Sequence, residues 1–321
     1  SKHSENIEKR IYDALSKSNQ KKLRAAMLYL LESGGKRLRA SLPFLIGELL
    51  NNAKKSHYDV GAAIEIIHNF TLIHDDIMDD DSVRRGRPSV HIEFDVPTAI
   101  NAGDAMLAVA FELISSSNEI ETEKLPNLVK IIGGMVRRVS EGQQLDIDNE
   151  NRRDISIEDY LYMIEGKTAV MFEACAKCGA ILSDASDEEV ELLGKWGLNL
   201  GLCFQIVDDL IDVISESNVS GKPLGSDLVQ GKMTCIVIHA MNKGDLNLNY
   251  VNKILGKGSD VNNEDIVLAI KELEESGSIE FCLELAKKYH SISKECLESF
   301  KNNKGYQVLS ELTDYHINRI N

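Results

Sequence analysis

Apolar residues recur along most of the chain at intervals of three and four positions, the spacing of one face of a helix. The longest segments with this spacing span residues 56–79, 156–183 and 187–214. Alternating apolar and polar runs, which are typical of strands, are scarce, and the best candidate is the short CIVIHA at 235–240. The pattern predicts an all-α protein.

The distribution of proline supports long helices. Only five prolines occur in the 321 residues, and none lies within 127–222 or 224–321, so no proline interrupts these segments. We expect helices at residues 4–17, 20–31, 38–51, 56–79, 97–117, 124–142, 156–183, 187–215, 228–243, 262–276, 278–300 and 305–319. No change of composition, linker or repeat marks a boundary. We therefore expect one domain over residues 1–321, a helical bundle with a buried middle.

The composition limits the possible classes of protein. With 43% hydrophobic and 27% charged residues, the chain is typical of a globular protein. Its formal net charge of −15 argues against a nucleic-acid-binding protein, because such proteins need a basic face for phosphates. No run of about eighteen apolar residues occurs, so we expect no membrane span. The first residues, SKHSENIEKRIYDAL, lack the apolar core of a signal peptide.

Six cysteines are scattered through apolar segments of this large chain. Their distribution favours reduced, buried thiols in a cytoplasmic protein over a disulfide framework. Cys175 and Cys178 form a CxxC pair, but the chain has no second such pair and no histidines at the spacing of a zinc site. We therefore expect no metal-binding or redox role for this pair.

Charge is unusually segregated in residues 72–88, LIHDDIMDDDSVRRGRP, where five aspartates within seven positions precede three arginines within four. Asp75 and Asp79 are four residues apart, so they lie about 40° apart around a helix axis and share a face. Like charges at this spacing repel each other, and a divalent cation between them would remove the repulsion. The alternative is a charged helix end whose aspartates pair with the arginines. The roles of Asp80 and Asp81 stay open.

A second acidic cluster lies in FQIVDDLIDV, residues 204–213. Asp208 and Asp212 are again four apart, Gln205 shares their face and Asp209 lies alongside. Their neighbours are strongly apolar, and burying unpaired carboxylates is costly, so a metal, another cation or a polar cavity is indicated. A solvent-facing acidic strip is the alternative. Magnesium binds carboxylates together with substrate phosphates, so two such faces across a cavity would hold a diphosphate through bridging Mg²⁺.

Basic residues cluster beside glycine in GGKRLR at 34–39, RRGR at 84–87 and GKT at 166–168, and after the second acidic cluster at Lys222 and Lys232. GGKRLR begins a predicted helix, where backbone N–H groups favour anions. GKT does not complete a P-loop, because that motif needs glycine where this chain has Leu161. The charges suggest two phosphorylated ligands, one held through magnesium and the other by Lys36, Arg39 and Arg85.

Six motifs in this order resemble the trans-isoprenyl diphosphate synthases, also called the polyprenyl synthetase family. They run from about residue 30 to about residue 240 as GGKRLR, HNFTLIHDDIMDDDSVRRGRP, GQQLD, GKT, FQIVDDLID and GKPLGSD. The resemblance implies an all-α bundle around a central substrate cavity, usually as a homodimer. It also implies successive Mg²⁺-dependent condensation of isopentenyl diphosphate with an allylic diphosphate, which can be dimethylallyl, geranyl or farnesyl diphosphate.

The resemblance also implies roles for individual residues. The ligands of two or three Mg²⁺ ions would be Asp75, Asp79 and Asp208, supported by Asp76, Asp209 and Asp212. The allylic diphosphate would be bound by Arg84, Lys167, Lys222 and Lys232, with polar support from Gln143, Asp146, Thr168 and Gln205. The isopentenyl diphosphate would be held by Lys36, Arg39, His68 and Arg85. No protein nucleophile is needed, and no side-chain base is assigned.

The product length rests on fewer residues. In this family the two residues four and five positions before the first aspartate help to close the product pocket, and here they are Thr71 and Phe70. This pair resembles archaeal-type synthases that make geranylgeranyl diphosphate, with farnesyl diphosphate as a second product. Ordinary core packing is the alternative role for Phe70. The alternative functions are a longer-chain polyprenyl diphosphate synthase, a weakly catalytic subunit of a heteromeric synthase, and a terpene cyclase, which would lack GGKRLR.

Overall fold

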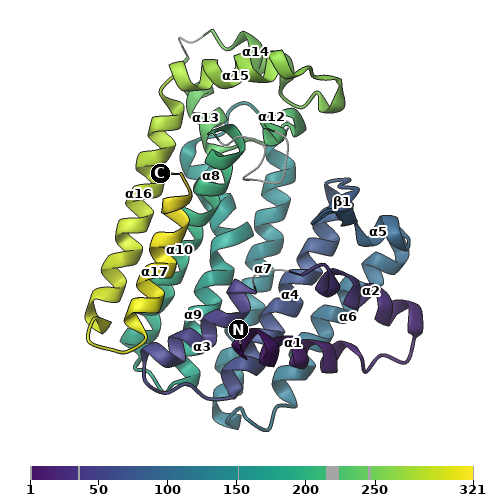
Figure 1. Ribbon diagram of the computed structural model, residues 1–321, viewed down its shortest axis with the longest axis vertical. Coiled ribbons are helices and arrows are strands. Elements are labelled where there is room, and N and C mark those ends of the chain that lie inside the picture. Colours follow the sequence, from purple (N-terminus) through teal and green to yellow (C-terminus); the bar gives the residue numbers. More distant parts are fainter. Residues whose placement is uncertain (1, 35–36, 151, 215–223, 245–246, 321) are drawn as a thin grey trace. The chain divides into compact units, whose positions relative to one another are not determined.

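The computed structural model describes residues 2–34, 37–150, 152–214, 224–244 and 247–320 (Figure 1). Contacts within the chain divide it into two compact units. Unit 1 comprises Ser1–Val136, Ala174–Gly194 and Asn302–Tyr306. Unit 2 comprises Arg137–Glu173, Lys195–Lys301 and Gln307–Asn321. The single domain over residues 1–321 stays a prediction.

Unit 1 is built from helices and one short hairpin. Its elements are α1 (Lys2–Leu15), α2 (Lys21–Glu32), α3 (Leu38–Leu49), α4 (Ser56–Met78), β1 (Val83–Arg84), β2 (Arg87–Pro88), α5 (Val90–Glu93), α6 (Val96–Ser115) and η1 (Thr122–Lys124). Three longer helices contribute residues to both units, namely α7 (Leu125–Asn149), α9 (Val170–Leu182) and α10 (Asp187–Ile214).

The regular elements among the described residues of unit 2 are all helices. Its further elements are α8 (Ile157–Ile164), η2 (Glu165–Ala169), α12 (Ser226–Gln230), α13 (Cys235–Asn242), α14 (Asn249–Ile254), η3 (Gly258–Asp260), α15 (Asn263–Glu275), α16 (Ser278–Leu297), η4 (Glu298–Phe300), α17 (Tyr306–Ile317) and η5 (Asn318–Ile320). The prediction of an all-α protein is confirmed, and CIVIHA at 235–240 lies in α13 and forms no strand.

Three of the predicted helices differ from the structure. The helix expected at 124–142 continues to Asn149 as α7. The single helix expected at 228–243 is wrong, because Gly231 has a φ of 85° and ends α12 four residues before α13 begins. The helix expected at 156–183 contains the five-residue π-helical turn η2 between α8 and α9. Such turns arise where an extra residue is fitted into a helix, and they are frequent at functional sites.

Helix α4 is the core of unit 1. It packs against α1, α3 and α6, and most of its side chains are buried because they are apolar on more than one face. Arg37, at the start of α3, is 4% exposed and donates from Nη1 to Oε1 of Glu65 on α4 at 3.1 Å. This buried ion pair fixes the second half of the GGKRLR segment to α4, and it commits Arg37 to a structural partner.

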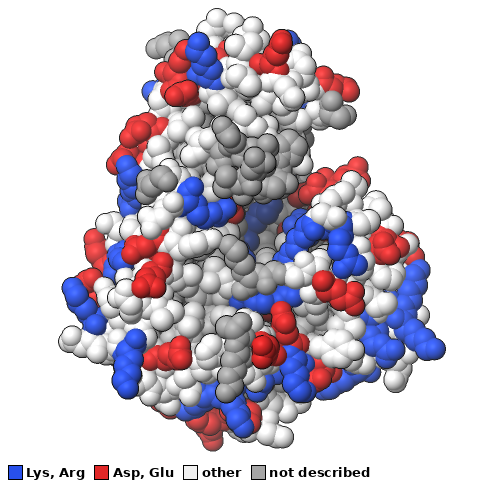
Figure 2. Space-filling view, in the orientation of Figure 1, with Lys and Arg blue, Asp and Glu red and all other residues white. Residues whose placement is uncertain are grey.

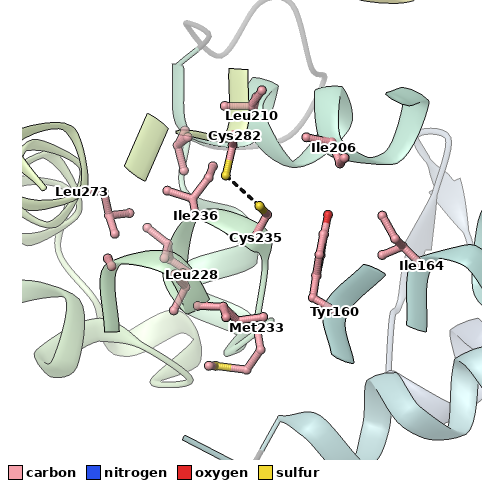
Figure 3. Packing of buried hydrophobic residues seen from close by; sticks show 14 of the residues in the cluster. Tyr160, Ile164, Ile206, Leu210, Leu228, Met233, Cys235, Ile236, Leu273 and Cys282 are labelled. Atoms are coloured by element: carbon pink, nitrogen blue, oxygen red, sulfur yellow. Dashed lines mark hydrogen bonds between the residues drawn. The ribbon is translucent and has the colours of Figure 1, made fainter. Parts of the chain in front are cut away.

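A large apolar cluster forms the core of unit 2 (Figure 3). It combines side chains of α8, α10, α12, α13, α15 and α16, among them Tyr160, Ile206, Leu228, Ile236 and Leu273. Trp196 of α10 is fully buried, and its indole N–H donates to Thr313 Oγ1 of α17 at 3.1 Å. Because the indole has its partner, the whole ring can be buried without leaving an unsatisfied donor.

Helix α6 is long and apolar enough to cross a membrane, by length and composition only. Within the described residues it packs on α4, and a single helix of this kind is weak evidence for a span, because core helices of globular proteins have the same length and composition. The face drawn in Figure 2 carries interspersed acidic and basic side chains rather than one broad basic surface.

The six cysteines are all buried free thiols, as expected from the sequence. Burial raises the pKa of Cys178 and of Cys203 to about 12, so little of either is the reactive thiolate near neutral pH. We expect an aromatic disulfide reagent at pH 8 to label almost none of the six thiols in the native protein and all six in denaturant. Rapid labelling of the native protein would contradict this burial.

Candidate active site

The first acidic cluster lies at the carboxyl end of α4 in unit 1. Asp75 is in the last turn, and Asp79 is the C-terminal cap, whose backbone N–H donates to the Asp75 carbonyl at 2.8 Å. The partial negative charge of a helix C-terminus adds to the repulsion between two carboxylates there. Both side chains are only partly buried. The site therefore presents oxygen ligands where a hard cation would be stabilising.

Asp80 and Asp81 have structural roles at this helix end. Asp80 has a φ of 53°, in the left-handed region that aspartate tolerates better than most residues, and it stops the helix. The Asp81 N–H donates to the Asp76 carbonyl at 2.9 Å, and its own carbonyl accepts from Ser89 Oγ at 2.5 Å. Asp80 and Asp81, whose roles the sequence left open, therefore end α4 and lead the backbone into the hairpin.

Asp76 differs from Asp75 and Asp79 because its carboxylate is buried against an arginine. It is fully buried, and its Oδ1 accepts from Arg84 Nε at 2.6 Å. Burial raises the pKa of Asp76, although Arg84 opposes that shift. Its Oδ2 is buried and has no hydrogen-bond partner among the described residues. Asp76 thus orients Arg84, which stands on the hairpin that follows α4.

The hairpin places Arg84 and Arg85 by a tight turn. Arg84 pairs with Arg87 across β1 and β2, which leaves a two-residue loop of Arg85 and Gly86. Both loop residues have positive φ, 53° and 75°, as a type I′ turn requires. The RRGR motif is therefore a hairpin turn. Arg85 Nη1 also donates to the Gly34 carbonyl, which ties this turn to the GGKRLR segment.

Unit 1 brings together three of the four residues predicted to bind isopentenyl diphosphate. Burial, followed by the nearby positive charges of Arg39 and Arg85, holds the pKa of His68 well below its ordinary value. His68 is therefore neutral at pH 7 and lies among arginines. The fourth residue, Lys36, lies outside the described residues. A group of cations around a neutral imidazole is suited to a phosphate ligand.

Two lysines meet one carboxylate in unit 2. Lys167 Nζ lies 2.5 Å and Lys232 Nζ 3.5 Å from Oδ2 of Asp146, and Lys232 also lies 3.1 Å from Glu150 Oε1. Burial raises the pKa of Asp146, but the two lysines outweigh it and hold the pKa below its ordinary value. Asp146 therefore holds two cations close together. Lys222, predicted to act with them, lies outside the described residues.

The π-helical turn η2 determines where Lys167 stands. Gly142 of α7 approaches this turn so closely that a Cβ on it would lie 2.2 Å from the Lys167 backbone N. Gln143, the next residue of α7, is 5% exposed, and Asp146 follows one turn later. The GQQLD and GKT motifs thus belong to one contact between α7 and η2. The P-loop interpretation is correctly excluded.

The three aspartates of the second acidic cluster have three different environments on α10. Asp208 Oδ1 lies 2.7 Å from Arg319 Nη1 of η5. Asp212 accepts from Ser226 Oγ at 2.7 Å and from the Asp227 N–H at 3.1 Å. Asp209 and Asp212 are both buried, at 6% and 7% exposure, and Asp208 and Asp212 share a helix face because they are four residues apart.

Asp209 belongs to a chain of hydrogen bonds inside unit 2. Tyr160 Oη donates to its Oδ2 at 2.6 Å, and Gln205 Nε2 donates to its Oδ1 at 2.9 Å. Thr168 Oγ1 in turn donates to Gln205 Oε1 at 2.9 Å. Burial raises the pKa of Asp209 to about 8, against the effect of these donors. Sequence reasoning missed Tyr160, whose only signal was a hydroxyl in an apolar helix two turns before Lys167.

Phe70 and Thr71, predicted to limit product length, lie on α4. Phe70 is 8% exposed and packs edge-on against His74, with ring centroids 5.3 Å apart. Thr71 is 9% exposed and its Oγ1 donates to the His68 carbonyl at 2.8 Å. Both residues are held in defined orientations, and core packing of Phe70 is compatible with this position.

Within the described residues, no three acidic, histidine or cysteine side chains converge as a metal centre. Each unit instead offers a pair of carboxylates four residues apart on one helix. Hard carboxylate oxygens in such pairs fit Mg²⁺, which usually keeps several water or phosphate ligands and needs only one or two carboxylates. Asp75 with Asp79, and Asp208 with Asp212, are the pairs that would hold it.

Similarity to known proteins extends over most of the chain. The family described as Polyprenyl synthetase matches residues 20–273. The chain is 38% identical to a geranylgeranyl diphosphate synthase of Methanosarcina mazei, over 98% of this chain and 95% of that protein. It is 37% identical to a geranylfarnesyl diphosphate synthase of Natronomonas pharaonis, over 98% and 94%.

The chain is also similar in fold to solved structures of prenyl diphosphate synthases. A geranylgeranyl pyrophosphate synthetase from Pyrococcus horikoshii has a TM-score of 0.90 and 34% identity, over 98% of this chain and 95% of that one. A decaprenyl diphosphate synthase from Rhodobacter capsulatus has a TM-score of 0.90 and 28% identity, over 100% and 97%. Motifs, fold and relatives therefore agree that the chain is a trans-prenyltransferase and belongs to the polyprenyl synthetase family.

Proposed function

We propose that this prenyltransferase condenses isopentenyl diphosphate with dimethylallyl, geranyl or farnesyl diphosphate to make geranylgeranyl diphosphate, with farnesyl diphosphate as a second product. The observation that carries the proposal is near full-length similarity to proteins named geranylgeranyl diphosphate synthase, at 38% identity in one case and 37% in another. Both aspartate pairs of the chain are intact.

Enzymes of this family use a divalent metal for diphosphate binding. We propose that Asp75 and Asp79 in unit 1, and Asp208 and Asp212 in unit 2, hold two or three Mg²⁺ ions. When bound, Mg²⁺ neutralises charge on the diphosphate oxygens. Asp76 and Asp209 support their neighbours through Arg84 and Gln205, to which they are hydrogen bonded.

Arg84, Lys167 and Lys232 bind the allylic diphosphate in this proposal, together with Lys222, which lies outside the described residues. Asp146 holds Lys167 and Lys232 close together before substrate arrives, so little reorganisation is needed as negative charge builds on the departing diphosphate. Lys36, Arg39, His68 and Arg85 hold isopentenyl diphosphate, whose double bond attacks the allylic carbon. The released diphosphate can accept the proton lost afterwards.

The test of this function is product identification. The pure protein is incubated with Mg²⁺, isopentenyl diphosphate and each allylic primer in turn, and the products are identified by mass spectrometry. A twenty-carbon product from all three primers supports the proposal. A product that stops at fifteen carbons, or extends well beyond twenty, contradicts it.

A second candidate product has twenty-five carbons. It is favoured by one observation, because the similarity to the geranylfarnesyl diphosphate synthase is 37% over nearly the whole chain, close to the 38% of the geranylgeranyl relative. The weakly catalytic subunit of a heteromeric synthase is disfavoured by the two intact aspartate pairs. Elongation by the isolated chain would exclude that alternative.

Replacing Phe70 with alanine is expected to lengthen the product by at least one isoprene unit, because a ring that is 8% exposed is removed from α4. Mass spectrometry of the product measures the effect. Leu72→Ala is the matched control, since Leu72 lies about 160° from Phe70 around the helix axis and should leave product length unchanged. An unchanged product in Phe70→Ala would assign Phe70 to core packing alone.

We also propose a cytoplasmic homodimer in which α6 contributes to the interface. This helix is the most apolar long helix of the described chain, yet Val96 and Ile100 are each 43% exposed. An apolar surface of this kind favours a protein partner. Ile100→Glu is expected to shift the mass in sedimentation from twice 35.7 kDa toward 35.7 kDa. A wild-type protein that sediments as a monomer would overturn this assignment.

A further inference from the structure

The inner carboxylate of the second acidic cluster points into the apolar core of unit 2. Asp209 is 6% exposed, and Tyr160, which donates to it at 2.6 Å, is 1% exposed. Figure 3 shows the Tyr160 ring within the apolar cluster, with Ile164, Ile206 and Cys235 among the residues around it. A carboxyl group in such surroundings is costly unless both of its oxygens have partners. Both oxygens of Asp209 have hydrogen-bond partners.

The chain of hydrogen bonds has a fixed direction. Oδ1 of Asp209 accepts from the Gln205 amide nitrogen at 2.9 Å, so the amide oxygen of Gln205 must point the other way. That oxygen accepts from the Thr168 hydroxyl at 2.9 Å. Oδ1 is an acceptor both in the carboxylate and in an acid whose proton lies on Oδ2, toward Tyr160, so a flipped Gln205 amide would place two acceptors against each other. The contact of Tyr160 holds in either protonation state, because a hydroxyl can donate to a carboxylate or accept from a carboxylic acid.

This chain of hydrogen bonds ends at Thr168, beside the proposed diphosphate site. Thr168 follows Lys167 in the π-helical turn η2, and Lys167 Nζ lies 2.5 Å from Asp146. Because the Thr168 hydroxyl gives its one proton to Gln205, only its lone pairs remain for the allylic substrate. An oxygen with lone pairs toward the substrate stabilises positive charge that develops on the allylic carbons.

We propose that Tyr160 is a positioning residue for prenyl transfer. Its hydroxyl holds the Asp209 carboxyl, which fixes the Gln205 amide and so directs the Thr168 hydroxyl beside Lys167. The inference rests on the proposed placement of Gln205 and Thr168 at the allylic site. Tyr160 touches neither substrate. Its effect is to keep Asp209 and Gln205 of α10 and Thr168 of η2 in one orientation while charge develops.

The direct test is Tyr160→Phe, which keeps the buried ring and removes only the hydroxyl. We expect kcat to fall by about tenfold and the KM for isopentenyl diphosphate to change little, because the loss acts on the transition state. Tyr162→Phe is the matched control. Tyr162 is on the same helix, is 54% exposed and packs on Arg138, so its hydroxyl should not matter. A folded Tyr160→Phe enzyme with wild-type kcat would overturn the proposal.

A double-mutant cycle separates positioning from general support of the fold. If Tyr160 acts through Thr168, Tyr160→Phe combined with Thr168→Val should have a kcat close to that of Thr168→Val alone. Losses that multiply would show that Tyr160 acts independently, and they would contradict the proposal. Thermal unfolding of each variant shows whether it is folded.

If Tyr160→Phe does not fold, the hydrogen-bond network can be tested at its other end, at Thr168. Thr168→Val should lower kcat by about tenfold, whereas Thr168→Ser keeps a hydroxyl and should retain most of the activity. Wild-type kcat in Thr168→Val would refute the positioning role. Failure of the proposed function would look different, because the wild-type protein itself would then form no elongated product.

Discussion

Asp75→Asn is expected to reduce the rate of prenyl transfer by about a thousandfold or more, because it removes a charged oxygen ligand at the proposed magnesium pair. Asp80→Asn should leave the rate within about twofold of wild type. Each substitution removes one negative charge, and the two positions are five residues apart. Steady-state turnover of isopentenyl diphosphate at saturating Mg²⁺ measures both.

The difference between these two variants follows from the end of α4. Asp75 and Asp79 share a helix face, whereas Asp80 has a φ of 53° and turns the chain away from that face. Asparagine tolerates the left-handed conformation nearly as well as aspartate, so Asp80→Asn should preserve the helix end. Equal losses in both variants would mean that total negative charge matters and that the shared face does not.

Gly142→Ala is expected to abolish most activity and to destabilise the protein, although it lies outside every predicted set of metal ligands. The new Cβ would lie 2.2 Å from the Lys167 backbone N and 2.8 Å from its Cα. Backbone atoms cannot rotate away as a side chain can, so α7 or η2 must shift. Overpacking of this kind costs about 1–3 kcal/mol or more, and it displaces Lys167 from Asp146.

Gly134→Ala is the matched control on the same helix. A Cβ on Gly134 would meet no heavy atom within 4 Å, and alanine is the better helix former by about 0.5–1 kcal/mol. Thermal unfolding and turnover should therefore be unchanged or slightly improved. The account is contradicted if Gly142→Ala unfolds at the wild-type temperature with wild-type turnover, since α7 and η2 would then not be in close contact.

The sequence predicted those features that depend on residues close together along the chain. The spacing of Asp75 and Asp79, and of Asp208 and Asp212, fixes a shared helix face because helical geometry is local. The helices themselves follow from the repeat of apolar residues at three and four positions. For the same reason the ordered motifs were enough to recognise the family before the fold was known.

The features that sequence reasoning missed depend on distant contacts. Tyr160 meets Asp209 across 49 positions, and Arg319 meets Asp208 across 111, so no local pattern reveals either pair. The π-helical turn η2 was hidden because its apolar pattern continues that of α8 and α9. The pairing of Arg37, in the basic GGKRLR segment, with Glu65 in the core of unit 1 joins residues 28 positions apart and is equally invisible in the sequence.

Prenyl transfer driven by Mg²⁺ held on paired aspartates is the central claim, and one measurement tests it most directly. The pure protein is stripped of metal with a chelator, supplied with isopentenyl and farnesyl diphosphates, and titrated with Mg²⁺ while the twenty-carbon product is quantified by mass spectrometry. We expect no product before Mg²⁺ is added and full turnover afterwards, with Asp75→Asn inactive throughout. Product formation in the chelator, or none at saturating Mg²⁺, would contradict the account.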